Sequence, residues 1–175
     1  FGWKRPDGTR RYRTCYIEIP RKNGKSSLCA GLALYLLMAD KEASAEVYSA
    51  AADREQAAII FDIATSMVSR SPELTRRLKV FRKVVAYDRA LSTYKVLSAD
   101  AYTKHGLNAH GIIFDELHAQ PSRDLWDVLT TSTGARSQPL TVAITTAGFD
   151  RNSICWELHE YARKVKEGII TDDSF

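Results

Sequence analysis

The sequence predicts an α/β domain built on a mostly parallel β-sheet that helices cover on both faces. Short β-branched and aromatic segments alternate along the chain with longer helical segments. Polar residues suited to binding phosphate or metal directly follow several of the predicted strands. The carboxyl ends of parallel strands meet at one edge of the sheet, where folds of this class bind their ligands. We therefore expect one domain of 175 residues with its site at that edge.

The first third of the chain reads as strand, helix, strand, helix. A β-branched and aromatic run predicts a strand over residues 12–19, and an apolar stretch predicts a helix over 25–39. A second strand is expected over 45–51. Asp53 is placed as the N-cap of an amphipathic helix that continues to about Val68.

The rest of the chain continues the alternation after an insertion. Ser71-Pro72 ends the second helix, and the segments 78–85 and 93–98 predict two strands, which could form a ribbon linked by Tyr87-Asp88-Arg89. The later elements are expected to be a strand at residues 111–114, a helix over 122–133, a strand over 140–146 and a helix over 153–166 ending at Gly168.

A phosphate-binding loop is predicted between the first strand and the first helix. The nine residues from Ile19 to Ser27 read Ile-Pro-Arg-Lys-Asn-Gly-Lys-Ser-Ser. A Gly-Lys-Ser at this junction places backbone N–H groups and a helix N-terminus around a polyphosphate, with Lys25 on the β and γ phosphates and the Ser26 hydroxyl on Mg²⁺. The usual pattern has a glycine where this chain has Ile19. A surface turn is the competing reading of this segment taken alone.

The second motif is Gly111-Ile-Ile-Phe-Asp-Glu-Leu-His118, an apolar run that ends in two carboxylates. At the end of a buried parallel strand, Asp115 would hold Mg²⁺ opposite Ser26, and Glu116 would polarise the attacking water. A solvated turn is the competing reading of this pair alone. Because the loop and the strand each supply the context that the other needs, together they predict a nucleoside triphosphate site.

A third strand end carries Thr145-Thr146-Ala147-Gly148. A threonine hydroxyl near the γ-phosphate could sense hydrolysis through a hydrogen bond. Taken alone, this segment is more typical of a β-branched strand followed by a glycine turn.

Composition limits the remaining possibilities. Hydrophobic residues make up 45% of the chain, which argues against disorder, and no apolar run reaches the roughly 18–20 residues of a membrane span. No leader sequence is recognisable, so we expect an intracellular protein. The three cysteines fit reduced core thiols better than disulfides or a zinc site. Because the chain starts at Phe1 without a methionine, we expect a fragment of a longer protein.

Positive charge is concentrated in two segments although the formal net charge is only +4. One is the first 13 residues. The other contains eight basic side chains: Arg70, Arg76, Arg77, Lys79, Arg82, Lys83, Arg89 and Lys95. This second block predicts either a surface for the phosphate backbone of a nucleic acid or an ordinary solvated face.

The three motifs together resemble the ATPase domain of the large terminase subunit, the DNA-packaging motor of tailed bacteriophages. The resemblance rests on Pro20-Arg-Lys-Asn-Gly-Lys-Ser26, Ile112-Ile-Phe-Asp-Glu-Leu-His-Ala119 and Thr145-Thr-Ala-Gly148, and it extends over nearly the whole chain. It implies an additional-strand, RecA-like P-loop NTPase fold. The departure at Ile19 fits this family, whose loop lacks the first glycine and carries basic residues.

The resemblance also implies a function and partners. The expected protein hydrolyses ATP with Mg²⁺ and moves double-stranded DNA into the procapsid, contacting the DNA backbone without sequence preference. It would assemble as a ring, expected to be a pentamer, on the portal protein in the host cell cytoplasm, and work with the small terminase subunit. The adenine-contacting segment would precede Phe1 and the nuclease domain would follow Phe175, so we expect one ATPase domain over residues 1–175 without nuclease activity.

Roles for single residues follow from the same resemblance. Glu116 would be the catalytic carboxylate, and Arg21 would contact the γ-phosphate. The nucleotide-binding set would be Arg21, Lys22, Asn23, Gly24, Lys25, Ser26 and Ser27, and the metal set Ser26 and Asp115. Thr145, Thr146 and Gly148 would couple hydrolysis to motion. For the basic finger from a neighbouring subunit, Lys104, Arg89 and Arg136 are equal candidates.

Two other functions fit parts of the sequence. Asp115-Glu-Leu-His118 also reads as the DExH box of a helicase, although the chain has Thr145-Thr146-Ala147 where a helicase has a Ser-Ala-Thr motif. A DNA-binding or assembly module that does not hydrolyse its nucleotide is the third reading. The intact set of Lys25, Asp115 and Glu116 favours an enzyme over such a module.

Overall fold

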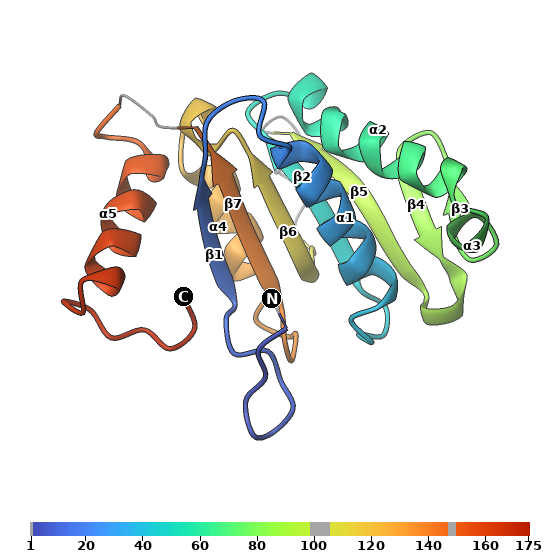
Figure 1. Cartoon of the computed structure of the whole chain (residues 1–175), viewed down its shortest axis with the longest axis horizontal. Helices are drawn as coiled ribbons and strands as arrows, with labels where there is room; N and C mark the ends of the chain where they lie inside the picture. Colours follow the sequence, from blue (N-terminus) through green and yellow to red (C-terminus); the bar gives the residue numbers. More distant parts are fainter. Residues whose placement is uncertain (1, 99–105, 147–149) are drawn as a thin grey trace.

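The computed structural model describes residues 2–98, 106–146 and 150–175. Strands and helices alternate along the chain as expected for an α/β fold (Figure 1). The elements are, in order, β1 (Thr14–Glu18), α1 (Lys25–Met38), β2 (Glu46–Ala51), α2 (Arg54–Arg70), α3 (Pro72–Thr75), β3 (Lys79–Val80), β4 (Val84–Tyr87), η1 (Asp88–Ala90), β5 (Ser92–Ser98), β6 (Ala109–Asp115), η3 (Leu117–Ala119), α4 (Asp124–Thr131), β7 (Leu140–Thr145) and α5 (Ile154–Lys166).

One sheet of seven strands runs through the described residues in the order β1-β7-β6-β2-β5-β4-β3. The first five strands of this order pair in parallel, and β4 and β3 are antiparallel additions at one edge. Strand β7 stands between β1, which precedes the predicted phosphate loop, and β6, which ends in the two carboxylates. This is the additional-strand arrangement that the family resemblance implies. It brings the carboxyl ends of β1, β7 and β6 together at one edge of the sheet (Figure 1).

Helices cover both faces of the sheet. Helices α1 and α2 pack on one face, against alternate residues of the strands such as Val47, Ile113 and Val142. Helices α4 and α5 pack on the other face, against a set that includes Ile112 and Phe114. Every residue of β6 is buried, as expected for a parallel strand covered on both sides. The burial of both faces fixes the register of the strands that carry the site.

A close approach between α1 and β6 requires a glycine. A Cβ atom built on Gly111 would lie 2.8 Å from Cδ1 of Leu36 and 3.2 Å from Cγ1 of Val47. Because α1 begins at the phosphate loop, this contact sets the position of the helix whose N-terminus faces the ligand edge.

The predicted helix ends are confirmed where side chains define them. Asp53 caps α2 by accepting a 2.8 Å hydrogen bond from the backbone N–H of Gln56. Ser153 caps α5 by accepting from the N–H of Trp156. Gly168, at φ 72°, ends α5 in the left-handed conformation that glycine adopts without strain.

The insertion between α2 and β5 differs from its prediction. The sequence predicts one strand over 78–85, but this segment folds as the β3–β4 hairpin, in which the N–H of Phe81 donates to the carbonyl of Val84. The ribbon itself is confirmed, since β4 pairs antiparallel with β5 through η1. All three cysteines have free thiols, and no helix among the described residues is long and apolar enough to cross a membrane.

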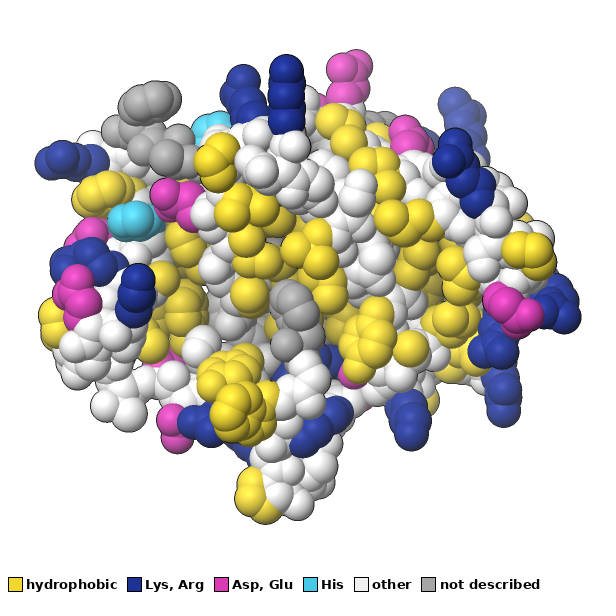
Figure 2. Space-filling model, viewed as in Figure 1, with side chains coloured by type: hydrophobic (Ala, Val, Ile, Leu, Met, Phe, Trp, Pro, Cys, Tyr) yellow, Lys and Arg dark blue, Asp and Glu magenta, His cyan; other side chains and the backbone are white. Residues whose placement is uncertain are grey.

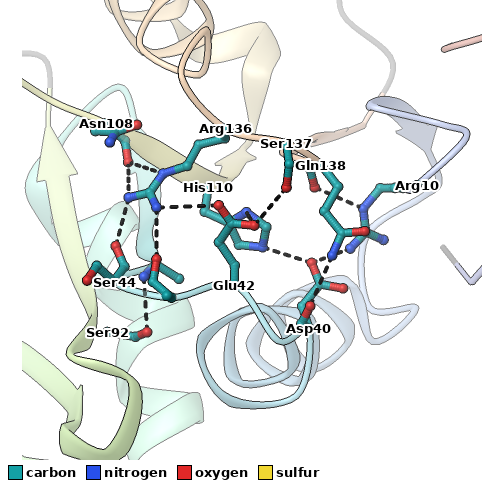
Figure 3. Close-up of polar contacts among 12 residues, drawn as sticks. Arg10, Asp40, Glu42, Ser44, Ser92, Asn108, His110, Arg136, Ser137 and Gln138 are labelled. Atoms are coloured by element: carbon teal, nitrogen blue, oxygen red, sulfur yellow. Dashed lines mark hydrogen bonds and ion pairs between the residues drawn. The ribbon is translucent and has the colours of Figure 1, made fainter. Parts of the chain in front are cut away.

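A buried polar network lies at the amino ends of the strands, away from the predicted site (Figure 3). Asp40, just after α1, accepts a hydrogen bond from Arg10 and lies 2.8 Å from Nε2 of His110 at the start of β6. These three side chains are at most 1% exposed. Nearby, Arg136 donates to the backbone carbonyls of Ala43, Ser44 and Asn108. The network joins the N-terminal segment, α1, β6 and the approach to β7.

Candidate nucleotide-binding and hydrolysis site

The loop after β1 leads into the N-terminus of α1 through two residues with positive φ. Gly24, at φ 75°, is the residue before α1, so no side chain caps this helix, and its first turn contains no acidic residue. Lys22 also adopts a positive φ, of 64°. The Asn23 amide donates to the carbonyls of Pro20 and Arg21, which holds the loop in shape. The N-terminus of α1 is therefore open to an anion.

A pocket of about 250 Å³ lies over this helix end. Its lining is almost entirely made of the predicted loop residues, together with one carboxylate that follows β6: Arg21, Lys22, Gly24, Lys25, Ser26, Ser27 and Glu116. Arg21 and Lys22 are exposed. All the residues predicted to bind nucleotide except Asn23 thus share one pocket with the predicted catalytic carboxylate.

Lys25 connects the loop to Glu116. Its side chain is 7% exposed, and its ammonium group lies 3.6 Å from Oε1 of Glu116 and donates to the carbonyl of Ile19 at 3.3 Å. A buried lysine needs such partners, because removing a charge from water without compensation is costly. The phosphates of a bound nucleotide would offer Lys25 stronger negative charge than either of these partners.

Glu116 adopts a backbone conformation that is unfavourable for a glutamate. Its φ and ψ are 47° and 53°, in the left-handed region, which costs roughly 1–3 kcal/mol for a residue with a Cβ. The strained turn directs the chain from β6 into η3 and leaves the Glu116 carboxylate within reach of Lys25. Strain of this kind persists where surrounding contacts impose it, and it is common at functional sites.

Asp115 is the last residue of β6 and is almost fully buried. Burial raises the pKa of this carboxyl group to about 6, and the adjacent charge of Glu116 contributes to the rise. Its Oδ1 accepts a 3.0 Å hydrogen bond from the N–H of Glu116. The raised pKa indicates a carboxylate that lacks sufficient positive charge around it in the protein alone, a property expected of a ligand for a cation.

The donor set fits Mg²⁺ bound together with phosphates. A carboxylate and a hydroxyl are hard oxygen ligands, the kind that Mg²⁺ prefers, and Asp115 and Ser26 provide one of each. The described residues contain no cluster of three or more acidic, histidine or cysteine ligands. In phosphate-binding enzymes one or two protein ligands suffice for Mg²⁺, because phosphates and water complete the shell.

Thr145 and Thr146 lie beside the Glu116 turn. Thr145 ends β7, is fully buried, and its hydroxyl accepts from the backbone N–H of His118. The Thr146 hydroxyl donates to Oε2 of Glu116 at 3.5 Å. The strand order makes this possible, because β7 lies directly next to β6.

The comparison with protein families decides the assignment. The model of the terminase large subunit ATPase domain matches residues 1–164. The chain belongs to this terminase family. The large terminase subunit of Enterobacteria phage HK97 is 36% identical over 136 residues, which cover 74% of this chain and 27% of that protein. The match confirms the resemblance in the three sequence motifs.

Solved terminase structures share the fold. The crystal structure of the HK97 large terminase superimposes with a TM-score of 0.80 at 32% identity, over 93% of this chain and 34% of that one. The ATPase domain of the Thermus phage P74-26 large terminase gives a TM-score of 0.63 at 21% identity, over 81% of this chain and 62% of that chain. The large terminase of another thermophilic bacteriophage was solved in complex with ADP and resembles this chain in fold, with a TM-score of 0.58 at 8% identity over 93% of this chain and 46% of that one. The chain spans between a quarter and two thirds of the length of these relatives.

Two of the predicted finger residues, Arg89 and Arg136, do not line the pocket of their own chain in this terminase domain. Arg89 is exposed in η1, at the end of the β4–β5 ribbon. The Arg136 side chain is 7% exposed, and its guanidinium is held by three carbonyls at the amino ends of the strands. Lys104 lies outside the described residues, as does Gly148 of the predicted coupling motif.

Sequence reasoning missed one residue of the site, His118. Its Nδ1 lies 3.2 Å from Oε2 of Glu116 and 2.9 Å from Oγ1 of Thr145. The signal is present in the sequence, since a histidine three residues after the strand-end aspartate completes the DExH pattern. That pattern by itself indicates a helicase and says nothing of a contact within the site.

Proposed function

We propose that this terminase domain is the motor ATPase that hydrolyses Mg·ATP and couples hydrolysis to the movement of double-stranded viral DNA into the procapsid. The observation that carries the proposal is the contact between Lys25 and Glu116, which places the loop lysine and the carboxylate after β6 in one pocket. The complex of a thermophilic phage's large terminase with ADP supports a nucleotide as the ligand.

Each side chain has a role consistent with its position. Lys25 and the N-terminal N–H groups of α1 bind the β and γ phosphates, and Arg21, exposed at the rim, contacts the γ-phosphate. Ser26 and Asp115 would hold Mg²⁺, which neutralises charge on the phosphates. Glu116 orients and deprotonates the attacking water. A basic residue from a neighbouring subunit, Lys104 or Arg89, stabilises the transition state.

The basic block on the insertion is the proposed surface for DNA. Lys and Arg side chains project from the end of the molecule formed by α3, β3 and β4 (Figure 2, right). Part of this charge is engaged in ion pairs, of Arg76 and Arg77 with Glu73 and of Lys79 with Asp88. In the described part of the chain, Arg82 and Lys83 at the hairpin tip have no acidic partner. Contacts of this kind bind phosphates without reading sequence, as a translocating motor requires.

The proposed assembly follows from the family. A ring of five subunits on the portal protein, in the cytoplasm of the host cell and with the small terminase subunit as a partner, would place each pocket beside a neighbour's basic finger. The domain over residues 1–175 supplies the ATPase of this machine, and we assign no nuclease activity to it. Because the chain belongs to the terminase family, we do not propose the helicase alternative.

The remaining alternative is a module that binds nucleotide without hydrolysing it. The test is Mg·ATP turnover by the purified chain over a wide range of protein concentration, with and without duplex DNA of unrelated sequences. A motor domain completed by its neighbours shows turnover per subunit that rises with protein concentration or with DNA, equally for each sequence. A nucleotide that binds without any turnover under all these conditions, DNA included, would favour the module.

A further inference from the structure

His118 occupies the centre of a hydrogen-bonded cluster between the Glu116 turn and β7. Its Nδ1 is 2.9 Å from Oγ1 of Thr145, 3.2 Å from Oε2 of Glu116 and 3.5 Å from Oγ1 of Thr146. Its backbone N–H donates to the same Thr145 hydroxyl at 3.3 Å. The imidazole is 25% exposed, so it is held mainly by these contacts and the packing of η3.

The neighbours of His118 favour a proton on Nδ1. An ionised carboxylate can only accept hydrogen bonds. The Nδ1 atom lies 3.2 Å from Oε2 of Glu116, so an unprotonated Nδ1 would set its lone pair against those of the carboxylate, which is unfavourable. The hydroxyl hydrogen of Thr145 has an acceptor in the carbonyl of Thr146, at 2.9 Å. The Thr145 oxygen therefore also acts as an acceptor toward His118. A hydrogen on Nδ1 therefore suits both neighbours.

The cluster continues from Thr145 to α5. The Cys155 thiol of that helix donates to the Thr145 hydroxyl at 3.8 Å and lies 3.7 Å from the hydroxyl of Tyr16 on β1. Thr145 is thus the point at which side chains from η3 and α5 converge on β7. His118 contacts both Glu116 and Thr145, so a displacement of Glu116 would be transmitted to Thr145 through this one side chain.

We propose that His118 is a positioning residue for hydrolysis, whose single Nδ1 hydrogen lies between Oε2 of Glu116 and Oγ1 of Thr145 and so ties that carboxylate to β7. The inference rests on the proposed ATPase function. It adds to the site a residue that lies outside both the phosphate loop and the Asp115-Glu116 pair.

The reason for such a residue lies in the second contact of Glu116. Oε1 of Glu116 is near Lys25, and Oε2 is near His118 and Thr146. When phosphates bind, Lys25 exchanges Glu116 for the phosphate oxygens, because these carry more charge. Oε1 then becomes available to the attacking water, while His118 keeps the carboxylate in its orientation. The left-handed backbone of Glu116 would otherwise favour relaxation of the turn.

The kinetic test compares three substitutions of His118 in this chain. Asparagine places an amide nitrogen near the position of Nδ1, glutamine places it farther out, and alanine has no donor. We expect His118→Ala to lower kcat about 10- to 100-fold, the usual effect of losing a hydrogen bond to a charged group, with KM for ATP within about twofold. His118→Asn should recover most of the loss and His118→Gln little. In a Glu116→Gln background, His118→Ala should have no further effect, because the acceptor charge is already gone.

Several outcomes would overturn the proposal. One is a His118→Ala variant that is as fast as the parent. Another is an equal loss of kcat for alanine and asparagine accompanied by a lower melting temperature, which would indicate a role in folding alone. The third is full additivity with Glu116→Gln.

A second measurement separates this inference from the proposed function. Nitrogen-15 NMR of the His118 ring distinguishes a protonated from an unprotonated Nδ1 and needs no turnover. If the parent chain does not hydrolyse ATP, the proposed function fails, yet the inferred geometry still requires a protonated Nδ1 whose resonance moves in Glu116→Gln and Thr145→Val. A proton on Nε2 alone, or resonances indifferent to both substitutions, would refute the geometry whatever the ATPase result.

Discussion

The ammonium group of Lys25 lies 3.6 Å from Oε1 of Glu116, so the cation of the phosphate loop and the carboxylate beyond β6 form an ion pair within the protein itself. The pair keeps two charges satisfied in a pocket with little solvent around the lysine. It also sets a condition for catalysis, because the lysine must leave Glu116 to reach the phosphates.

Replacing Lys25 by methionine should remove nucleotide binding. The side chain keeps its apolar stem but loses the charge that meets the phosphates, and we expect at least about 100-fold weaker binding of Mg·ATP, from the loss of one or more charge-assisted hydrogen bonds. Isothermal titration calorimetry measures the affinity. Lys83→Met, at the exposed hairpin tip, is the matched control and should bind like the parent. Equal affinities for Lys25→Met and the parent would show that the loop does not hold phosphate.

Replacing Asp115 by asparagine should stabilise the domain at neutral pH when no nucleotide is added. Burial, aided by the charge of Glu116, raises the pKa of Asp115 from its ordinary 3.8 to about 6. The folded protein therefore holds a proton that the unfolded chain releases between these values, and the free energy of unfolding falls as the pH rises through them. We expect a gain of about 1–3 kcal/mol at pH 7.5 and almost none at pH 4.

Thermal melting at the two pH values measures this effect. Asp62→Asn, an exposed carboxyl group on α2, is the control and should leave both melting temperatures unchanged. A lower melting temperature for Asp115→Asn at pH 7.5 would mean that the ionised Asp115 is stabilised in the free protein.

Removing the carboxylate of Asp40 should strongly destabilise the fold. Burial by itself favours protonation of this group, but the hydrogen bonds from His110 and Arg10 and the charge of Arg10 hold the pKa of Asp40 below its usual value. Asp40→Ala takes away the carboxylate that the buried Arg10 guanidinium contacts, at a cost of about 3–5 kcal/mol. Asp127→Ala, which breaks the exposed pair with Arg123, should cost less than about 1 kcal/mol.

The contacts of Asp40 with Arg10 and His110 also predict how the stability of the domain changes in acid. Because the pKa of Asp40 is depressed in the folded state, its contribution is present above the unfolded value near 3.8 and is lost as the pH falls below it. Urea unfolding of the parent and Asp40→Ala between pH 3 and pH 7 should therefore show a difference that shrinks toward acid. A difference that is constant over this range would contradict the assignment.

The hairpin tip should contribute to DNA affinity in a salt-dependent way. Each lost phosphate contact lowers the slope of log Kobs against log salt by about 0.9, so Arg82→Ala with Lys83→Ala should lower it by about 2. The control, Lys164→Ala with Lys166→Ala, removes the same charge from α5 at the other end of the molecule (Figure 1). Fluorescence anisotropy with a labelled duplex measures both. If the two double variants have equal slopes of log Kobs against log salt, the DNA does not bind at the hairpin tip.

Most of the fold was predictable because its strands are buried on both faces. Continuous apolar runs such as that of β6 can satisfy their backbone groups and side chains in few other ways, and the caps Asp53 and Ser153 mark helix starts by local chemistry. The β3–β4 turn was not predictable, since its tip, Phe81-Arg82-Lys83, contains no glycine, proline or asparagine to signal a reversal.

The motif residues of the site were predictable from the sequence, but the contacts between side chains from different strands were not. Lys25, Asp115 and Glu116 follow from local patterns at strand ends, and the order β1-β7-β6 explains how these patterns meet. The contact between His118 and Thr145 exists because β7 lies next to β6 in the sheet. The spacing of residues along the chain does not reveal this strand order. The burial of Arg136 was not predictable for a similar reason, because the backbone carbonyls that bind it come from two other segments.

The most direct test of the account is a paired measurement on the parent chain and Glu116→Gln, of Mg·ATP affinity and of the rate of phosphate release in a single turnover with excess protein and duplex DNA. If Glu116 is the catalytic carboxylate, the variant binds Mg·ATP at least as tightly as the parent, since a negative charge beside the phosphates is gone, and releases phosphate at least about 100-fold more slowly. Phosphate release at the parental rate by the variant would contradict the central claim.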